Sequence, residues 1–192
     1  MPVEVSVPGV CRPAGWRHIG NLRATIARSG RVPPVHAFFG AESPLSQWHL
    51  SPFTVGRITY QTAEHWMMAG KAALFGDRDA FERVVAAPDP ASAKRVGRQV
   101  AGFEQARWDA ACRHLVYVGN VAKFGQCPNL AESLLATGSK VLVEAAANDP
   151  IWGAGLGMGD PGLQDPRQWP GQNMLGFVLM DVRDMLRLQR GV

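Results

Sequence analysis

The sequence predicts a mainly α, irregular multi-helical domain with a minor short β component. From Thr62 onward, apolar residues recur at helical spacing in several segments, most of which open at a capping side chain or proline. Stretches rich in β-formers are few and short. Fourteen prolines and 21 glycines spread along the chain indicate many loops between short elements, which argues against one long bundle.

The chain has 192 residues, enough for one domain, or for one domain with a tail. Residues 1–35 hold scattered prolines and glycines, five arginines and only weak periodicity, apart from a short helical pattern near Ile19, Leu22 and Ile26. We therefore expect an N-terminal extension over residues 1–35, packed on the main domain or loose beside it. The domain itself is expected over residues 36–192.

The first elements of the domain follow from turn and cap signals. In FTVGRITY, β-formers surround Gly56 and predict a short strand or a hairpin. Thr62 can cap a helix that Gly76 ends. Asp77 can cap a second helix, which places Phe81 and its apolar neighbours inward.

The later elements are predicted in the same way. Asp89 followed by Pro90 starts a third helix, and a longer helical stretch covers 105–126. Pro128 begins another helix that stops at Gly138.

The C-terminal part ends in the clearest helix of the chain. The strand-like run KVLVEAA comes first, followed by a Gly/Pro/Trp-rich loop over 148–171. The last helix is predicted from an apolar stripe at helical spacing with charged residues between its members, formed by Leu175, Val178, Leu179, Val182, Met185 and Leu186.

Composition limits the function classes only loosely. The net charge of +4 suits an anionic small molecule and also weak nucleic-acid contact. We find no apolar run of the ~20 residues that a membrane span requires, and no secretory signal. Cys11, Cys112 and Cys127 have no framework spacing, which fits a reducing compartment, so a cytoplasmic location is expected. The histidines lack metal-ligand spacing, and no metal or cofactor is expected.

TAEHWMMAGKA, residues 62–72, is the first candidate site. On a helix, Glu64 and Lys71 stand at i and i+7, so a carboxylate and an amine share one face. A fixed carboxylate can stabilise the cation-like sugar carbon that forms as an N-glycosidic bond breaks, or activate water. Lys71 can hold a phosphate or attack an opened ribose to form a Schiff base. A solvated helix face explains the same pattern.

The second candidate site is YVGNVAKFGQ, residues 117–126. Asn120 and Lys123 follow Gly119 in a predicted helix, where glycine costs about 1 kcal/mol relative to alanine. The glycine indicates close approach by a neighbour or ligand, or a break between two helices. Upstream, Trp108 can stack on a base or fill the core.

The third candidate site is NDPIWGAGLGMGD, residues 148–160. Its alternating glycines fail the dinucleotide fingerprint, because Met158 and Asp160 occupy the positions of the required third glycine. A ligand-wrapping loop with Asp149 and Trp152 at its mouth remains, although Asp149 before proline also favours a turn.

The fourth candidate site is WPGQNMLG, residues 169–176. Gln172 and Asn173 precede the last helix, where free N–H groups and amide side chains can together bind a phosphate; helix capping by Asn173 is the alternative. Lys94, Arg95 and Arg98 form a basic strip on the third helix, expected as a solvated face with phosphate or nucleic-acid contact as the minority interpretation.

The order of these segments is more specific than any one of them. From about residue 36 to residue 188 the chain resembles the NADAR (YbiA-like) family. The segments that carry the resemblance are SPF, ITYQTAEHWMMAGKAALFGD, AKRVGRQVAGF, ARWDAACR, YVGNVAKF, LLATGSKVLVEAA, DPIWGAGL and GQNMLG.

The resemblance implies an irregular, mainly α domain and an N-glycosidase of the hydrolase class, acting on phosphoribosyl intermediates of riboflavin synthesis or on ADP-ribose attached to guanine. A non-catalytic NAD- or ADP-ribose-binding module is the alternative. The expected partner is a small phosphorylated, nucleotide-like molecule, with ADP-ribosylated nucleic acid as a further candidate and no membrane.

Site residues are carried over by position. The resemblance implies catalytic roles for Glu64, Lys71 and Asp149. The residues it places near the substrate are Trp108, Asn120, Lys123, Trp152, Gln172 and Asn173. The opening segment SQWHLSPF departs from the family's SNFYPSPF, so that Gln47 replaces an asparagine and His49 a tyrosine where the base is expected.

Overall fold

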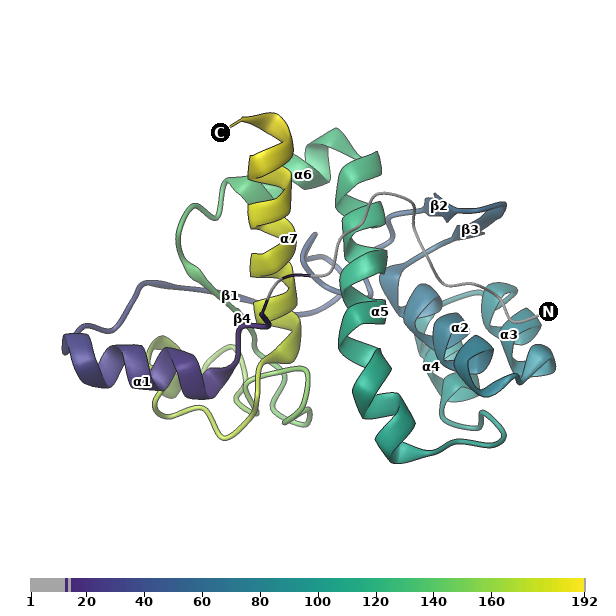
Figure 1. The fold of residues 1–192 in the computed structure, drawn as a ribbon, viewed down its shortest axis with the longest axis horizontal. Helices are drawn as coiled ribbons and strands as arrows, with labels where there is room; N and C mark the ends of the chain where they lie inside the picture. Colours follow the sequence, from purple (N-terminus) through teal and green to yellow (C-terminus); the bar gives the residue numbers. More distant parts are fainter. Residues whose placement is uncertain (1–12, 14, 192) are drawn as a thin grey trace. The chain divides into compact units, whose positions relative to one another are not determined.

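The computed structural model describes residue 13 and residues 15–191; the remaining positions, Cys11 among them, lie outside the described part of the chain. The described residues form two compact units. The continuous unit spans Gln47–Cys127, and the split unit combines the described residues of Pro13–Ser46 and Pro128–Val192. Helices dominate both units (Figure 1). In this part of the chain, no helix combines the length and apolar character that crossing a membrane demands.

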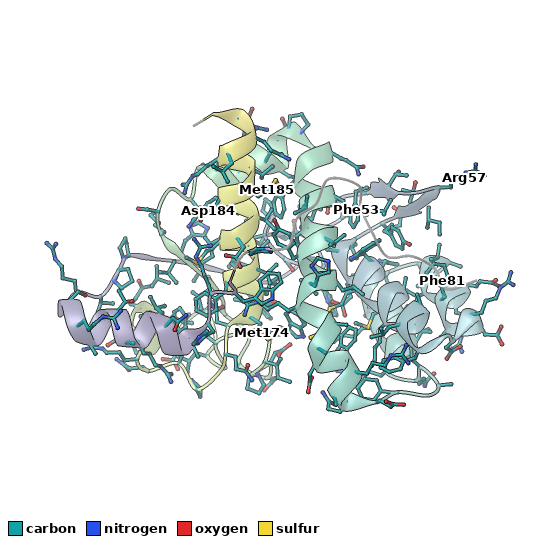
Figure 2. The ribbon with its side chains drawn as sticks, in the orientation of Figure 1. Phe53, Arg57, Phe81, Met174, Asp184 and Met185 are labelled. Carbon is teal, nitrogen blue, oxygen red and sulfur yellow. The ribbon has the colours of Figure 1, made fainter. Side chains whose placement is uncertain are left out.

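The elements of the continuous unit are β2 (Phe53–Val55), β3 (Ile58–Tyr60), α2 (Ala63–Phe75), α3 (Arg78–Val85), α4 (Pro90–Gly97) and α5 (Gln105–Gln126). Of the two predicted alternatives, a short strand or a hairpin, the structure has the hairpin: β2 and β3 pair antiparallel around Gly56. The φ of Gly56, 62°, lies in the left-handed region that glycine favours. Arg57, at the tip of this hairpin, points into solvent (Figure 2). α2 is the central helix, with α3, α4 and α5 packed on it.

The predicted helix boundaries of this unit are confirmed. Thr62, Asp77 and Asp89 each accept a hydrogen bond from the backbone N–H group three residues further on. Pro90 occupies the first position of α4, where its missing N–H costs nothing. Gly76 ends α2 in the left-handed conformation, with φ of 75°.

Three glycines let the helices around α2 approach closely. A Cβ atom at any of them would overlap a side chain of a packed neighbour; the overlapping pairs would be Gly70 with Leu115, Gly97 with Met68, and Gly119 with Trp66. α5 runs unbroken through Gly119. Of the two interpretations of this glycine, close approach by a neighbour is therefore correct, and the neighbour is the indole of Trp66.

The elements of the split unit are α1 (Ile19–Ser29), β1 (Val35–Phe38), α6 (Pro128–Leu135), β4 (Val141–Glu144), the 3-10 helix η1 (Pro161–Gln164) and α7 (Met174–Arg190). β1 and β4 pair in parallel, with Val35 opposite Val141 and Phe38 opposite Glu144. β4 and α7 are confirmed predictions. β1 was not predicted, because its partner lies far along the chain and no local turn marks the pairing.

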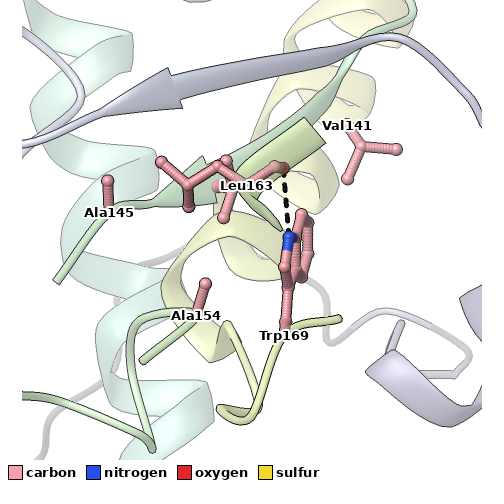
Figure 3. Close-up of a cluster of buried hydrophobic side chains, with 6 residues drawn as sticks. Val141, Ala145, Ala154, Leu163 and Trp169 are labelled. Atoms are coloured by element: carbon pink, nitrogen blue, oxygen red, sulfur yellow. Dashed lines mark hydrogen bonds between the residues drawn. The ribbon is translucent and has the colours of Figure 1, made fainter. Parts of the chain in front are cut away.

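A cluster of buried side chains forms the core of the split unit (Figure 3). Its members are Val141, Val143, Ala145, Ala154, Leu163 and Trp169. The indole N–H of Trp169 donates to the Leu163 carbonyl at 3.0 Å, so the one polar atom of this ring is satisfied inside the core. The apolar stripe of α7 faces the interior as predicted, with Val178, Leu179 and Val182 fully buried.

The described part of residues 1–35 is attached to the split unit. The short helix expected near Ile19 is α1, and Ile19 and Leu22 pack against the core cluster. Arg23 donates hydrogen bonds to backbone carbonyls of the loop that precedes α7. Arg17 forms an ion pair with Asp181 of α7.

One predicted boundary is wrong. α6 ends at Leu135, whereas the sequence analysis placed its end at Gly138. The chain leaves α6 through a turn in which the Gly138 N–H donates to the Leu135 carbonyl at 3.0 Å. The hydroxyl of Thr137 also donates to the carbonyl of Leu134, which favours a turn over another helical residue.

Candidate active site

Glu64 is a buried carboxylate in the first turn of α2, with 4% of the residue exposed. Its backbone N–H donates to the backbone carbonyl of Gln47 at 3.0 Å, which ties the segment before β2 to the start of α2. Its Oε1 lies 4.0 Å from Nζ of Lys94 on α4. A buried charge requires compensation, and the helix N-terminus and the ammonium both supply it. The fold therefore holds the Glu64 carboxyl group in a defined place, with an ammonium beside it.

Lys94 is the neighbour of Glu64 that the sequence analysis missed. It was assigned to a solvated basic strip with Arg95 and Arg98, and those two are exposed. Lys94 instead is half-buried, and its ammonium lies 5.8 Å from the ring centre of Trp48. No spacing signal identifies it, because its position beside Glu64 results from the packing of α4 on α2.

Lys71 lies two turns from Glu64, about 10 Å along α2. Its ammonium is 4.2 Å from the ring centre of Phe103 and 5.5 Å from that of Trp108. Burial lowers the pKa of this ammonium. The structure thus brings together Lys71 and Trp108, two of the predicted site residues, by cation–π contact.

Asn120 of α5 meets Gln47. Its Nδ2 donates to Oε1 of Gln47 at 2.9 Å and to the backbone carbonyl of Val116 at 2.8 Å. Gln47 therefore contacts α5 through its side chain and Glu64 through its backbone. In the sequence, Gln47 stands out only as a departure from the family pattern.

Lys123 follows Asn120 by one turn on α5 and is almost fully buried, with 1% exposed. Its ammonium lies 4.9 Å from the ring centre of Phe124. Burial lowers the pKa of Lys123 to about 7. At neutral pH a substantial fraction of this side chain is therefore the neutral amine, which can accept a proton or act as a nucleophile.

Asp149 and Trp152 lie together in the split unit. Oδ1 of Asp149 accepts hydrogen bonds from the backbone N–H groups of Ile151 at 3.1 Å and Trp152 at 2.9 Å. This is the geometry of an aspartate-stabilised turn, the alternative that the sequence left open. Trp152 is half-buried.

The backbone N–H groups at the start of α7, which the sequence predicts to be free for a phosphate, have carbonyl partners. The N–H groups of Gln172, Asn173, Met174 and Leu175 all donate to carbonyls of residues 150–153, at 2.7–3.2 Å. Since these donors are already used, they are not free to bind an anion. The two motifs DPIWGAGL and GQNMLG instead form one hydrogen-bonded structure. The side chain of Gln172 is exposed.

Asn173 connects α7 to β4. Its Nδ2 donates to the Leu142 carbonyl at 2.8 Å, and its Oδ1 accepts from the Glu144 N–H at 3.0 Å. It stands at the N-cap of α7 with a φ of 52°, and its side chain does not cap the helix. A Cβ at Gly176 would overlap this amide, which explains the glycine. Asn173 thus serves the fold, which neither predicted role anticipated.

Two further features of the described residues bear on ligand binding. A depression of about 390 Å³ lies at the C-terminal end of α2, lined by Phe75, Gly76, Asp77 and their neighbours. The Asp77 carboxylate there is already bonded to the N–H groups of Ala80 and Ala101. Within residues 13 and 15–191, no three His, Cys, Asp or Glu side chains are grouped to hold a metal ion.

Comparison with known proteins gives the family. The NADAR domain model matches residues 37–187. N-glycosidase R617 of Acanthamoeba polyphaga mimivirus is 42% identical over 125 residues, which are 65% of this chain and 74% of that protein. N-glycosidase YbiA of Escherichia coli is 31% identical over 152 residues, 79% of this chain and 84% of YbiA.

A plant relative and a solved structure extend the comparison. The chloroplastic riboflavin biosynthesis protein PYRR of Zea mays is 32% identical over 133 residues, 66% of this chain but 20% of that longer protein. The NMR structure of E. coli YbiA superposes with a TM-score of 0.68 at 27% identity, covering 83% of this chain and 89% of YbiA. This likeness confirms the predicted mainly α fold class. The chain belongs to the NADAR domain family.

Proposed function

We propose that this protein hydrolyses the bond between C1 of a ribose and a nitrogen on a phosphorylated, nucleotide-like substrate. The substrate classes are phosphoribosyl intermediates of riboflavin synthesis and ADP-ribose attached to guanine. The coarser part of this function follows from the family: the chain is an N-glycosidase, a hydrolase, as R617 and YbiA are named. The riboflavin class is supported by the name of the maize relative.

The observation that carries the proposal is the placement of Glu64. Its carboxylate is withdrawn from solvent, lies at a helix N-terminus and has Lys94 beside it. As the C1–N bond breaks, the sugar carbon gains positive charge, and a fixed carboxylate stabilises that charge or takes a proton from the incoming water. Water then supplies the oxygen to C1, and the departing base takes up a proton.

The lysines have supporting roles in the proposal. Lys71 is held over two aromatic rings with its pKa lowered by burial, which suits phosphate binding or Schiff-base formation with an opened ribose. Lys123 provides a buried amine on α5 whose pKa is about 7. Asp149 stabilises a turn, and we give it no step in the reaction.

The test is the variant Glu64→Gln. It keeps the shape of the side chain and removes the charge, so we expect kcat to fall by about 10²–10⁴-fold with the fold retained. Mass spectrometry of released base, with a panel of phosphoribosyl N-glycosides and an ADP-ribosylated oligonucleotide, measures this and assigns the substrate. Glu104→Gln is the control, since Glu104 is exposed in the same unit. Near-normal turnover of Glu64→Gln would remove this residue from the chemistry.

A further inference from the structure

Two buried amide side chains that are bonded to each other each keep one polar atom unused. Gln47 is 7% exposed and Asn120 is fully buried. Nε2 of Gln47 and Oδ1 of Asn120 have no hydrogen-bond partner among the described residues. Leaving such a buried group unpaired costs about 1–3 kcal/mol, so two of them in one bonded pair require an explanation.

The orientation of both amides is fixed by their neighbours. The Val116 carbonyl can only accept, so the nitrogen of Asn120 must face it, and the second N–H of that nitrogen goes to Gln47. The oxygen of Gln47 accepts this bond, which leaves its nitrogen pointing elsewhere. The two unused atoms do not bond to each other, so each keeps its capacity to form a hydrogen bond. A donor and an acceptor thus remain on two linked, planar groups.

The backbone of Gln47 links this amide pair to the start of α2. The backbone carbonyl of Gln47 accepts from the N–H of Glu64 at 3.0 Å. Asn120 is one turn before Lys123 on α5. A ligand that reaches both unused atoms is therefore held close to the start of α2.

We infer that the Gln47–Asn120 amide pair binds the lactam edge of the leaving base. Nε2 of Gln47 donates to a ring carbonyl oxygen, and Oδ1 of Asn120 accepts from the adjacent ring N–H. Guanine and oxopyrimidine rings carry this –C(=O)–NH– edge, and asparagine and glutamine amides are common readers of a base edge that offers a donor and an acceptor. The inference rests on the proposed function and makes Gln47 and Asn120 specificity-determining residues.

The inference is tested by binding, which requires no turnover. Calorimetry of the full chain compares guanosine 5′-monophosphate with 2-aminopurine riboside 5′-monophosphate, a purine that lacks the carbonyl and the ring N–H. We expect the wild type to bind the guanine nucleotide at least about tenfold more tightly. In Gln47→Met this ratio should fall to within about threefold, because the side-chain donor is lost while the backbone bond to Glu64 remains.

A second variant and a control keep the result interpretable. Gln47→Glu retains an oxygen that accepts from Asn120 but turns the unused donor into an acceptor, so the ratio should fall there also. Gln61→Met changes an exposed glutamine of the same unit and should leave the ratio at the wild-type value.

Three outcomes overturn the inference. The first is equal affinity of the wild type for the two nucleotides, and the second is an unchanged ratio of the two affinities in both Gln47 variants. The third is an equal loss of ribose 5-phosphate binding in Gln47→Met, which would assign the amide pair to the sugar. Discrimination without hydrolysis of any panel substrate would count against the proposed function and leave the amide pair standing. Hydrolysis of a panel substrate without discrimination between the two nucleotides would overturn the role of the amide pair and leave the proposed function standing.

Discussion

Single residues of the continuous unit show how burial changes chemistry. Glu64 and Lys123 are both almost inaccessible, and each is an ionisable group that ordinarily stays in water. Glu64 is compensated by Lys94 and by the start of α2. For Lys123, burial favours the neutral amine over the ammonium. Groups with such environments are candidates for catalysis, which is why both enter the proposed function.

Lys123 also makes the free energy of unfolding depend on pH. Its pKa is about 7 in the folded protein and 10.5 for an ordinary lysine. Between these values the unfolded chain binds more protons than the folded chain, so the contribution of this residue to stability rises with pH. We expect the wild type to gain stability relative to Lys123→Met from about pH 7 to about pH 10, measured by urea unfolding.

Lys140→Met is the control for this prediction, because Lys140 is exposed. The difference in free energy of unfolding between Lys140→Met and the wild type should stay nearly constant from about pH 7 to about pH 10. A flat difference for Lys123→Met would show that burial does not shift the protonation of this side chain.

At the level of elements, the position of α2 depends on small residues that let neighbouring helices come close. Glycine weakens a helix, yet α5 keeps Gly119 because the Trp66 indole occupies the space of a side chain there. That indole donates to the Leu115 carbonyl at 2.8 Å and packs edge-on against Tyr60, with ring centres 5.1 Å apart. The same contact therefore aligns α2, α5 and the hairpin.

We expect Gly119→Ala to destabilise the protein by about 1–3 kcal/mol, since overlap with Trp66 outweighs the gain in helix propensity of about 1 kcal/mol. Gly125→Ala is a matched control in the same helix, where nothing lies within 4 Å of the added methyl group. It should be neutral or stabilising by up to about 1 kcal/mol. Thermal unfolding of both variants decides this, and an equal effect at the two positions would contradict close packing at Gly119.

At the scale of the whole molecule, the split unit is built from both ends of the chain. β1 pairs with β4, and α1 packs against the core that β4 and the loop before α7 form. Residues before position 36 are therefore part of a packed structure where they are described. Whether α1 contributes to stability can be measured at its one fully buried side chain, Ile26.

We expect Ile26→Ala to cost about 2–4 kcal/mol in urea unfolding, as for other buried large-to-small changes. Ile151→Ala is the control, since Ile151 in the same unit is 48% exposed and should cost less than about 1 kcal/mol. Equal, small effects at both positions would mean that α1 is only loosely attached.

The sequence by itself determined most of the helices, the N-caps of α2, α3 and α4, and the family. Thr62, Asp77 and Asp89 act within one turn of their own position, so local residues were enough to predict them. The sequence also singled out Glu64 and Asn120 as candidates, but it could not show their neighbours. Its prediction of free N–H groups at the start of α7 was wrong, because the donors of Gln172 and Asn173 are used by a loop more than fifteen residues earlier.

Only the tertiary structure decided which side chains meet. Lys94 reaches Glu64 because α4 packs on α2, Gln47 reaches Asn120 because the segment before β2 lies against α5, and β1 finds β4 across most of the chain. The physical reason is range: caps and periodicity act over a few residues, whereas ion pairs, buried amides and parallel strands join positions that are distant in sequence.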